Sequence, residues 1–273
     1  MAKTRVLVVE DSATVRERLC SVLATDPDVD LIGVASDGRE AFDLCRAHRP
    51  DVVTMDMMLP VMNGLAATEQ IMAHCPTPIL VVSSSFNRGE LFKMYDALAA
   101  GAVDVLEKPN GEEPDGDWER RFLSTLKLVS RIRVITHPRA RLRTQGLNAA
   151  QHTSPTSPQT ALDGIKIAAV GASTGGPGAV VEVFRNLPAD LSLPILLVLH
   201  INPQFGGAFA EWLDRQTPWS AAFARDGEPL SGAVGRIVMA PPDRHMLVRA
   251  GRIRLDDGPE RFSCRPWSLS SVV

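Results

Sequence analysis

Short apolar runs alternate with amphipathic stretches along the first part of the chain. The runs are rich in Val and Ile and are bounded by Gly, Pro, Asp or Ser, which is typical of buried β-strands. The predicted strands cover residues 6–9, 31–35, 52–55, 79–82 and 103–106. The amphipathic stretches, with apolar residues at helical spacing, cover residues 13–24, 38–47, 64–74, 89–100 and about 118–134. Five βα units of this kind predict a doubly wound parallel sheet with helices on both faces.

The hydrophobic pattern stops after these units. Residues 137–160 contain Arg139, Arg141 and Arg143, followed by Ser-Pro-Thr-Ser-Pro at 154–158, and show no apolar period. This composition predicts an exposed linker. The three arginines could contact an anion, but a solvated basic linker is the favoured interpretation.

Apolar runs then resume and predict a second α/β domain. Strands are expected at residues 165–170, 195–199, 235–240, 246–248 and 252–255, and helices at 178–186 and 206–216. The predicted organisation is an N-terminal (βα)5 domain at residues 3–125, the linker at 137–160 and a second domain at 161–273.

Composition narrows the possible functions. The chain has 273 residues, of which 45% are apolar and 22% charged, which suits two ordinary globular domains. The net charge of −3 argues against nucleic acid as a partner. The sequence contains no run of eighteen apolar residues, so we expect no membrane insertion. The four cysteines are scattered, which indicates neither a zinc site nor a disulfide framework and favours a reducing cytoplasm; they are Cys20, Cys45, Cys75 and Cys264.

Charged and hydroxyl side chains follow four of the predicted strands. Glu10 and Asp11 follow the first strand, Asp56 the third, Ser83 the fourth and Lys108 the fifth. Because the carboxyl ends of parallel strands meet at one edge of the sheet, these side chains should converge. One Asp after a strand is more often a helix cap or turn residue. The conjunction at four strand ends is what predicts a functional site.

Three carboxylates packed together repel one another, and a divalent cation would relieve the repulsion. Hard oxygen ligands favour Mg²⁺. We expect Asp11 to bind the metal directly, Asp56 to share it and Glu10 to tune it. The backbone carbonyl of Met58 is a further predicted ligand.

This acidic edge predicts phosphoryl chemistry. With Mg²⁺ present, the Asp56 carboxylate could attack a phosphorus atom and become an acyl phosphate. Lys108 would then pair with phosphoryl oxygens, and Ser83 would hydrogen-bond to one of them.

The motifs around these residues resemble the signature of two-component response-regulator receivers. They are Val-Val-Glu-Asp-Ser at 8–12, Met-Asp-Met-Met-Leu-Pro-Val-Met-Asn-Gly at 55–64 and Glu-Lys-Pro at 107–109. The resemblance implies a receiver fold and phosphotransfer to Asp56 from a sensor histidine kinase. Many receivers carry an aromatic switch residue three positions before the lysine, whereas this chain has Val105 there.

A glycine-flanked serine follows the first strand of the second domain. Gly171-x-Ser173-x-Gly175 matches the nucleophile-elbow pattern, in which a tight turn exposes the serine hydroxyl before a helix. Two other interpretations compete: Ser173 could cap the following helix, or the glycines could hold a dinucleotide pyrophosphate. A dinucleotide site predicts an acidic residue after the next strand, but His200 stands there. A histidine is a suitable general base, which favours a hydrolase; His245 is an alternative base.

Three motifs of the second domain resemble the chemotaxis-specific protein-glutamate methylesterase. They are Gly-Ala-Ser-Thr-Gly-Gly-Pro at 171–177, His-Ile-Asn-Pro-Gln-Phe at 200–205 and Ala-Pro-Pro-Asp-Arg-His-Met at 240–246. The resemblance implies hydrolysis of glutamate methyl esters on chemoreceptors, with Ser173 as nucleophile, His200 as base and no cofactor for the ester step. It also implies deamidation of receptor glutamines, and a receiver that occludes the serine until Asp56 is phosphorylated.

The family's third catalytic residue, an Asp in a Gly-Met-Gly-x-x-Asp-Gly stretch, has no counterpart before Val273. On this ground we expect a methylesterase-type domain that is incomplete at its C-terminus, marginally stable and weak or inactive as an esterase. The alternative function is a catalytically inactive response regulator that acts as a phosphoryl acceptor or docking module. A transcription factor is less favoured, because the second domain shows neither a helix-turn-helix nor a basic face.

Overall fold

The computed structural model describes residues 3–84, 88–109, 114, 116–134, 166–188, 190–199, 203–242 and 244–257. The chain divides into two compact units, residues 1–148 and 149–273. The predicted linker at 137–160 lies outside the described residues, so its boundaries stay a prediction.

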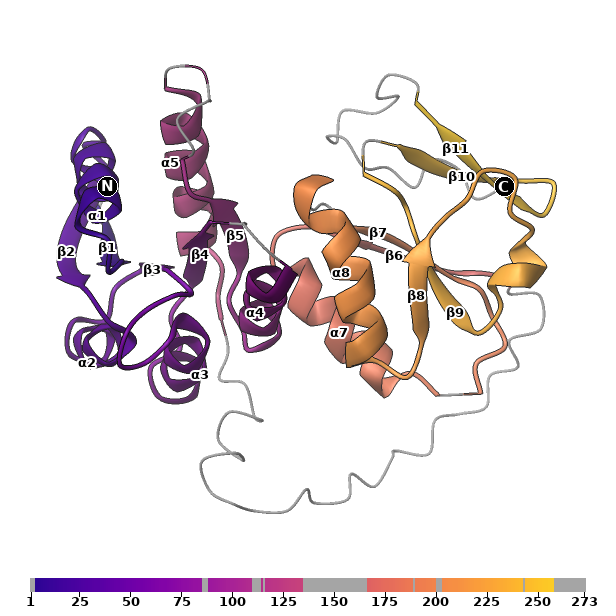
Figure 1. Cartoon of the computed structure of the whole chain (residues 1–273), viewed down its shortest axis with the longest axis horizontal. Coiled ribbons are helices and arrows are strands. Elements are labelled where there is room, and N and C mark those ends of the chain that lie inside the picture. The colour runs from indigo at the N-terminus through magenta and orange to yellow at the C-terminus, as the bar shows by residue number, and fades with distance from the viewer. Residues whose placement is uncertain are drawn as a thin grey trace, which may run out of the picture. The chain divides into compact units, whose positions relative to one another are not determined.

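The first unit is built on a five-stranded parallel sheet with the strand order β2-β1-β3-β4-β5 (Figure 1). Its strands are β1 (Thr4–Val9), β2 (Val29–Ala35), β3 (Val52–Met55), β4 (Ile79–Ser83) and β5 (Asp104–Glu107). All five predicted strands are confirmed, and the fold class is the doubly wound one expected. Because β1 and β3 are neighbours near the middle of the sheet, the residues that follow them emerge side by side.

Five helices cover the two faces of this sheet. They are α1 (Ala13–Ala24), α2 (Gly38–His48), α3 (Gly64–His74), α4 (Arg88–Ala99) and α5 (Asp117–Ser130). Helices α1 and α5 lie on one face, and α2, α3 and α4 lie on the other (Figure 1). On the first face, Leu19 and Leu23 of α1 and Trp118 and Phe122 of α5 pack on buried strand residues such as Val8.

Helix α5 ends earlier than the periodicity predicts. The apolar pattern continues to Val134, but the helix ends at Ser130, and Arg131 forms its C-cap. Ile132 and Val134 still pack against the core, although they are no longer helical. The apolar spacing therefore predicted correctly which residues pack against the core at this end, but it predicted the end of the helix incorrectly.

The second unit has a four-stranded parallel sheet with the order β6-β7-β9-β8. The strands are β6 (Ala168–Ala172), β7 (Ile195–Leu199), β8 (Ser220–Phe223) and β9 (Arg236–Met239), and the helices are α7 (Gly176–Asn186), α8 (Pro203–Gln216) and the short 3₁₀ helix η1 (Leu230–Ala233). Strand β8 was not predicted. It lies at the sheet edge, is only partly buried and reads Ser-Ala-Ala-Phe, so it lacks the β-branched residues that mark its neighbours.

An antiparallel hairpin completes the described part of this unit. It pairs β10 (His245–Arg249) with β11 (Arg252–Asp256). The two residues between the strands, Ala250 and Gly251, both have positive φ angles of 49° and 70°, as a tight two-residue hairpin turn requires. Met246 and Val248 of β10 share an apolar cluster with Val238 of β9, so the hairpin covers one face of the sheet.

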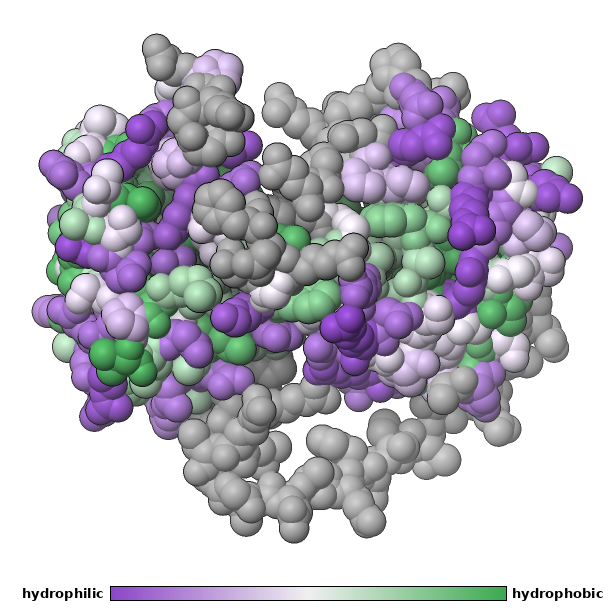
Figure 2. Space-filling view, viewed as in Figure 1, coloured by the Kyte–Doolittle hydropathy of each residue, from purple (hydrophilic) through white to green (hydrophobic). Residues whose placement is uncertain are grey.

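The surface is that of ordinary globular domains. On the side shown in Figure 2, hydrophobic residues are scattered among hydrophilic ones in both units. The exposed large apolar residues of the described chain are Leu31, Met58, Val61, Leu128, Val183 and Val234. None of the described helices combines the length and apolar character needed to cross a membrane.

Candidate functional site

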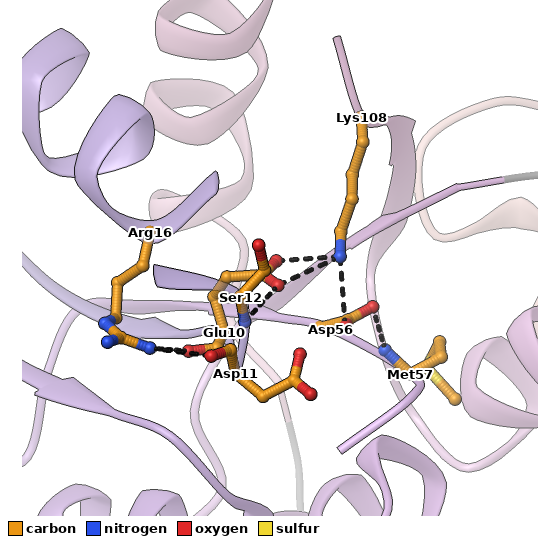
Figure 3. A network of polar contacts seen from close by, with 7 residues as sticks. All are labelled: Glu10, Asp11, Ser12, Arg16, Asp56, Met57 and Lys108. Atoms are coloured by element: carbon orange, nitrogen blue, oxygen red, sulfur yellow. Dashed lines mark hydrogen bonds and ion pairs between the residues drawn. The ribbon is translucent and has the colours of Figure 1, made fainter. Parts of the chain in front are cut away.

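The predicted acidic edge exists at the carboxyl ends of β1, β3 and β5 (Figure 3). Val9 of β1 is paired with Met55 of β3, so Glu10 and Asp56 follow at adjacent positions. The backbone N–H of Asp56 donates to the Val9 carbonyl at 3.0 Å, which extends the ladder beyond the strands. Sheet register thus brings together two carboxylates that are 46 positions apart in the sequence.

The carboxylates of Glu10, Asp11 and Asp56 form a compact cluster. One oxygen from each lies within 4.8 Å of the others. Glu10 is fully buried and Asp56 is 3% exposed, whereas Asp11 is exposed. Two buried carboxylates this close would repel strongly in a poorly solvated site, so the cluster requires a cation.

Lys108 supplies a positive charge to this cluster. Its Nζ lies 2.8 Å from Oε2 of Glu10 and 3.0 Å from Oδ2 of Asp56. Its backbone N–H donates to the Ser83 carbonyl at 3.1 Å, which fixes the start of the side chain. The structure thus brings together four side chains that the sequence predicted to converge: Glu10, Asp11, Asp56 and Lys108.

The pKa values of this cluster reflect burial and charge. Burial raises the pKa of Glu10, and the negative charge of Asp56 adds to the rise, while Lys108 opposes it. Burial alone would lower the pKa of Lys108. The hydrogen bond to Glu10 and the charges of Asp56 and Glu10 outweigh it, so the Lys108 pKa is raised and the side chain stays cationic.

Ser83 lies at the end of β4 with 1% of its surface exposed. Within the described chain its Oγ is buried and has no hydrogen-bond partner. A buried hydroxyl left unpaired costs about 1–3 kcal/mol. A ligand oxygen at this edge of the sheet would satisfy it, which matches the role predicted for Ser83.

The loop after β3 orients Asp56. The Met57 N–H donates to Oδ1 of Asp56 at 2.7 Å, while Lys108 holds the other oxygen. The chain then returns so closely that a Cβ on Gly64 would lie 2.1 Å from the Asp56 carbonyl, so only glycine fits there. Gly64 donates to the Met57 carbonyl at 3.2 Å, and Asn63 caps α3 by accepting from the Ala66 N–H.

The outer part of the same loop is exposed and strained. Val61 is 88% exposed and has a φ of 61°, which is unusual for a β-branched residue. The Gly38 N–H donates to the Met62 carbonyl at 3.0 Å and helps to hold this turn. Met58, a predicted metal ligand through its carbonyl, has an exposed side chain whose sulfur lies 3.6 Å from Nζ of Lys93; its ligand role stays a prediction.

Two residues that the sequence analysis missed also touch this site. Arg16 of α1 donates to the carbonyls of Glu10 and Asp11 at 2.8 and 3.0 Å (Figure 3). The buried indole of Trp118 donates to the Glu107 carbonyl at 2.7 Å, directly before Lys108. Both act on backbone carbonyls, which leave no residue pattern in a sequence. The only signal in the sequence was an arginine five positions after Asp11, in the first turn of the predicted helix.

In the second unit, Ser173 lies in the turn between β6 and α7 and is exposed. Its carbonyl accepts from the Gly176 N–H at 2.6 Å, and Gly175 has a φ of 75°. Gly175 rather than Ser173 is the N-cap of α7, so the interpretation of Ser173 as the helix cap is wrong. The strand–serine–helix arrangement of the predicted nucleophile elbow is present.

The predicted base, His200, lies outside the described residues. His245, the alternative base, begins β10 and is half-buried. The choice between the two histidines stays a prediction.

Comparisons with known proteins give the same two parts. Residues 6–114 match the response regulator receiver domain, and residues 168–268 match CheB methylesterase. A protein-glutamate methylesterase/protein-glutamine glutaminase of Anaeromyxobacter dehalogenans is 42% identical over 92% of this chain and 70% of that protein. One from Nitrosospira multiformis is 40% identical over 94% of this chain and 72% of that protein. The chain belongs to the protein-glutamate methylesterase/protein-glutamine glutaminase family.

A solved structure is similar to part of this family member. The response regulator domain of Thermotoga maritima CheB has 34% sequence identity and a TM-score of 0.43, and the match covers 48% of this chain and 98% of that chain. The curated relatives are longer than this chain, which spans 70% and 72% of the two named above.

Replacing Lys108 tests the charge balance of the cluster. Lys108→Met should lower the free energy of unfolding of the first unit by about 3 kcal/mol, because Glu10 and Asp56 remain buried without their cation. Adding Glu10→Gln should restore part of the loss. The pKa of Lys108 is raised in the folded chain. The difference in free energy of unfolding between wild type and Lys108→Met should therefore be complete below the pKa of an unfolded lysine, about 10.4. It should shrink as the pH rises through the pKa of Lys108 in the folded chain.

Urea unfolding of the metal-free chain, monitored by hydrogen exchange of β1 and β3, would measure this loss of stability. The control is Lys93→Met, which removes an exposed lysine of α4 and should change stability by less than about 0.5 kcal/mol. Equal stabilities of Lys108→Met and Lys93→Met would contradict the proposed balance.

Proposed function

We propose that this chain is a phosphorylation-regulated chemotaxis hydrolase that demethylates glutamate methyl esters and deamidates glutamines on chemoreceptors. The observation that carries the proposal is the cluster of Glu10, Asp56 and Lys108 beside the unpaired hydroxyl of Ser83. The family of the chain supports the hydrolase part, since the relatives above are named for these two activities.

In the first unit, Asp56 is the proposed phosphoryl acceptor. One of its oxygens forms a bond to phosphorus while the bond between phosphorus and the donor breaks, which yields an acyl phosphate. Lys108, already 3.0 Å from Asp56, would pair with an oxygen of the transferred group. The Ser83 hydroxyl would donate to another, which would satisfy its buried oxygen.

The donor set fits a hard divalent cation, because its side-chain atoms are all carboxylate oxygens close together. Glu10, Asp11 and Asp56, with the Met58 carbonyl, are the residues that would hold Mg²⁺. When bound, Mg²⁺ supplies the positive charge that offsets the carboxylates and the phosphoryl oxygens.

In the second unit, Ser173 is the proposed nucleophile and His200 the proposed base. The serine oxygen attacks the ester carbonyl as His200 takes its proton, and that proton then leaves with the methoxide as methanol. Water attacks the resulting acyl-serine and releases the glutamate carboxylate. The positive end of the α7 dipole lies beside this turn and is suited to an oxyanion, and this chemistry requires no cofactor.

The proposed partners follow from these two chemistries. A sensor histidine kinase of chemotaxis would donate the phosphoryl group, and methyl-accepting chemoreceptors would supply the esters. Because such esters are on the cytoplasmic rods of receptors, we place the activity in the cytoplasm. Phosphorylation of Asp56 would shift the population toward an arrangement in which Ser173 is accessible.

Phosphorylation at Asp56 is tested with acetyl phosphate, a small acyl-phosphate donor, and Mg²⁺. The full chain should gain one phosphoryl group, and mass spectrometry should place it on Asp56. Asp56→Asn should take up no label. The wild-type chain in excess chelator should take up none either. The control is Asp43→Asn, a change at an exposed carboxylate of α2. Labelling of Asp56→Asn at the wild-type level would refute the assignment.

Hydrolysis at Ser173 is tested with methylated receptor and release of methanol as the readout. Ser173→Ala should reduce the rate by on the order of 10⁴-fold or more, because no other group replaces the nucleophile. Phosphorylation of Asp56 should be unaffected in the same variant. The control is Ser192→Ala, which removes an exposed serine whose hydroxyl donates to the nearby Asp190 carbonyl.

If Ser173→Ala and wild type release methanol equally, the hydrolase part is wrong. A chain that is labelled at Asp56 but hydrolyses nothing would support the alternative, a phosphoryl acceptor or docking module without catalysis.

A further inference from the structure

Arg16, in the first turn of α1, donates hydrogen bonds to the backbone of the acidic loop, which is formed by Glu10 and Asp11. Nη1 of Arg16 donates to the carbonyl of Glu10 at 2.8 Å and to that of Asp11 at 3.0 Å (Figure 3). An –NH₂ group carries two hydrogens, so one terminal nitrogen can serve both acceptors. Arg16 therefore ties two consecutive peptide groups to α1.

These carbonyls occupy a special position. Strand β1 ends at Val9 and α1 begins at Ala13, so Glu10 and Asp11 belong to neither element, and their carbonyls are outside the regular bonds of both. Backbone groups at such a junction depend on side-chain partners. The Arg16 guanidinium is that partner here.

The two carboxylates of this loop are supported differently. The Glu10 side chain is buried and is held by Lys108 and by the Ser12 N–H, which donates to Oε1 at 3.1 Å. The Asp11 side chain is exposed. Its direction is therefore governed by the conformation of its own backbone, which Arg16 holds through the Asp11 carbonyl.

We propose that Arg16 is a positioning residue for the metal-binding loop: by holding the carbonyls of Glu10 and Asp11 it keeps the Asp11 carboxylate directed toward Asp56. The proposal rests on the proposed receiver function. Arg16 acts through the backbone and is not itself a ligand. Both partners are carbonyl oxygens, which only accept hydrogen bonds. An arginine suits this role because it presents several donors and no acceptor.

Charge and position predict opposite results for this residue. Arg16 places a positive charge beside a site for a divalent cation, so removing that charge alone should strengthen Mg²⁺ binding. Removing the hydrogen bonds should weaken binding, because the Asp11 carboxylate is then less well oriented. The sign of the change in affinity therefore separates a positioning residue from a mere neighbouring charge.

The chain offers a matched control on the same helix. Arg18 is half-exposed and pairs with Glu119 of α5 at 2.7 Å. Arg18→Met removes the same charge and the same number of donors as Arg16→Met without touching the acidic loop. Arg16→Lys keeps the charge but replaces the planar group with a shorter ammonium.

Titration calorimetry with MgCl₂ on the full chain should show about tenfold weaker binding for Arg16→Met, the lower end of losses seen when groups that orient ligands are removed. Arg18→Met should stay within twofold of wild type or bind slightly more tightly, and Arg16→Lys should be intermediate. In the metal-free chain, hydrogen exchange of residues 10–13 should be faster in Arg16→Met only.

Mg²⁺ affinity of Arg16→Met equal to or tighter than that of wild type would overturn the inference, as would unchanged exchange of residues 10–13. If wild type is labelled at Asp56 in these cases, the proposed function survives and only the role of Arg16 falls. If wild type neither binds Mg²⁺ nor is labelled, the proposed function itself is wrong and the inference falls with it.

Discussion

The Lys108 ammonium between two buried carboxylates is the interaction on which the first unit depends. Glu10 and Asp56 are almost fully buried, and both lie within 3.0 Å of Nζ of this lysine. Such a grouping is unfavourable unless opposite charge is held in place. The parallel sheet provides that arrangement, because it brings the ends of β1, β3 and β5 to one edge. The same lysine then faces the position where a phosphoryl group on Asp56 would place new negative charge.

The second unit uses related geometry for different chemistry. Here too, adjacent parallel strands deliver residues to one edge of the sheet, since Ala172 and Leu199 are paired and Ser173 follows directly. A positive φ at Gly175 lets the chain turn at once into α7. The result is an exposed serine next to a helix N-terminus rather than a buried charge cluster. One unit is thus suited to hold phosphate and the other to expose a nucleophile.

Sequence reasoning succeeded where side-chain type carries the signal. Strands rich in Val and Ile were predicted, and residues placed after them, such as Asp56 and Lys108, converge as expected. It failed where the signal is weak or absent: β8 has no β-branched residue, and α5 ends at Ser130 although apolar spacing continues. Arg16 and Trp118 were missed because their partners are carbonyls of the backbone. A sequence shows donors but does not show which peptide groups lie within reach.

The most direct test of the central claim is the ionisation of Lys108 itself. In the folded, metal-free chain, its ammonium should remain protonated above the pKa of an ordinary lysine, about 10.4, because Glu10 and Asp56 favour the charged form. Nitrogen NMR of the lysine Nζ, assigned through Lys108→Met, would follow this titration. A Lys108 pKa above the ordinary value, moved down by Glu10→Gln, is the predicted result. A pKa at or below the ordinary value, unaffected by Glu10→Gln, would contradict the account.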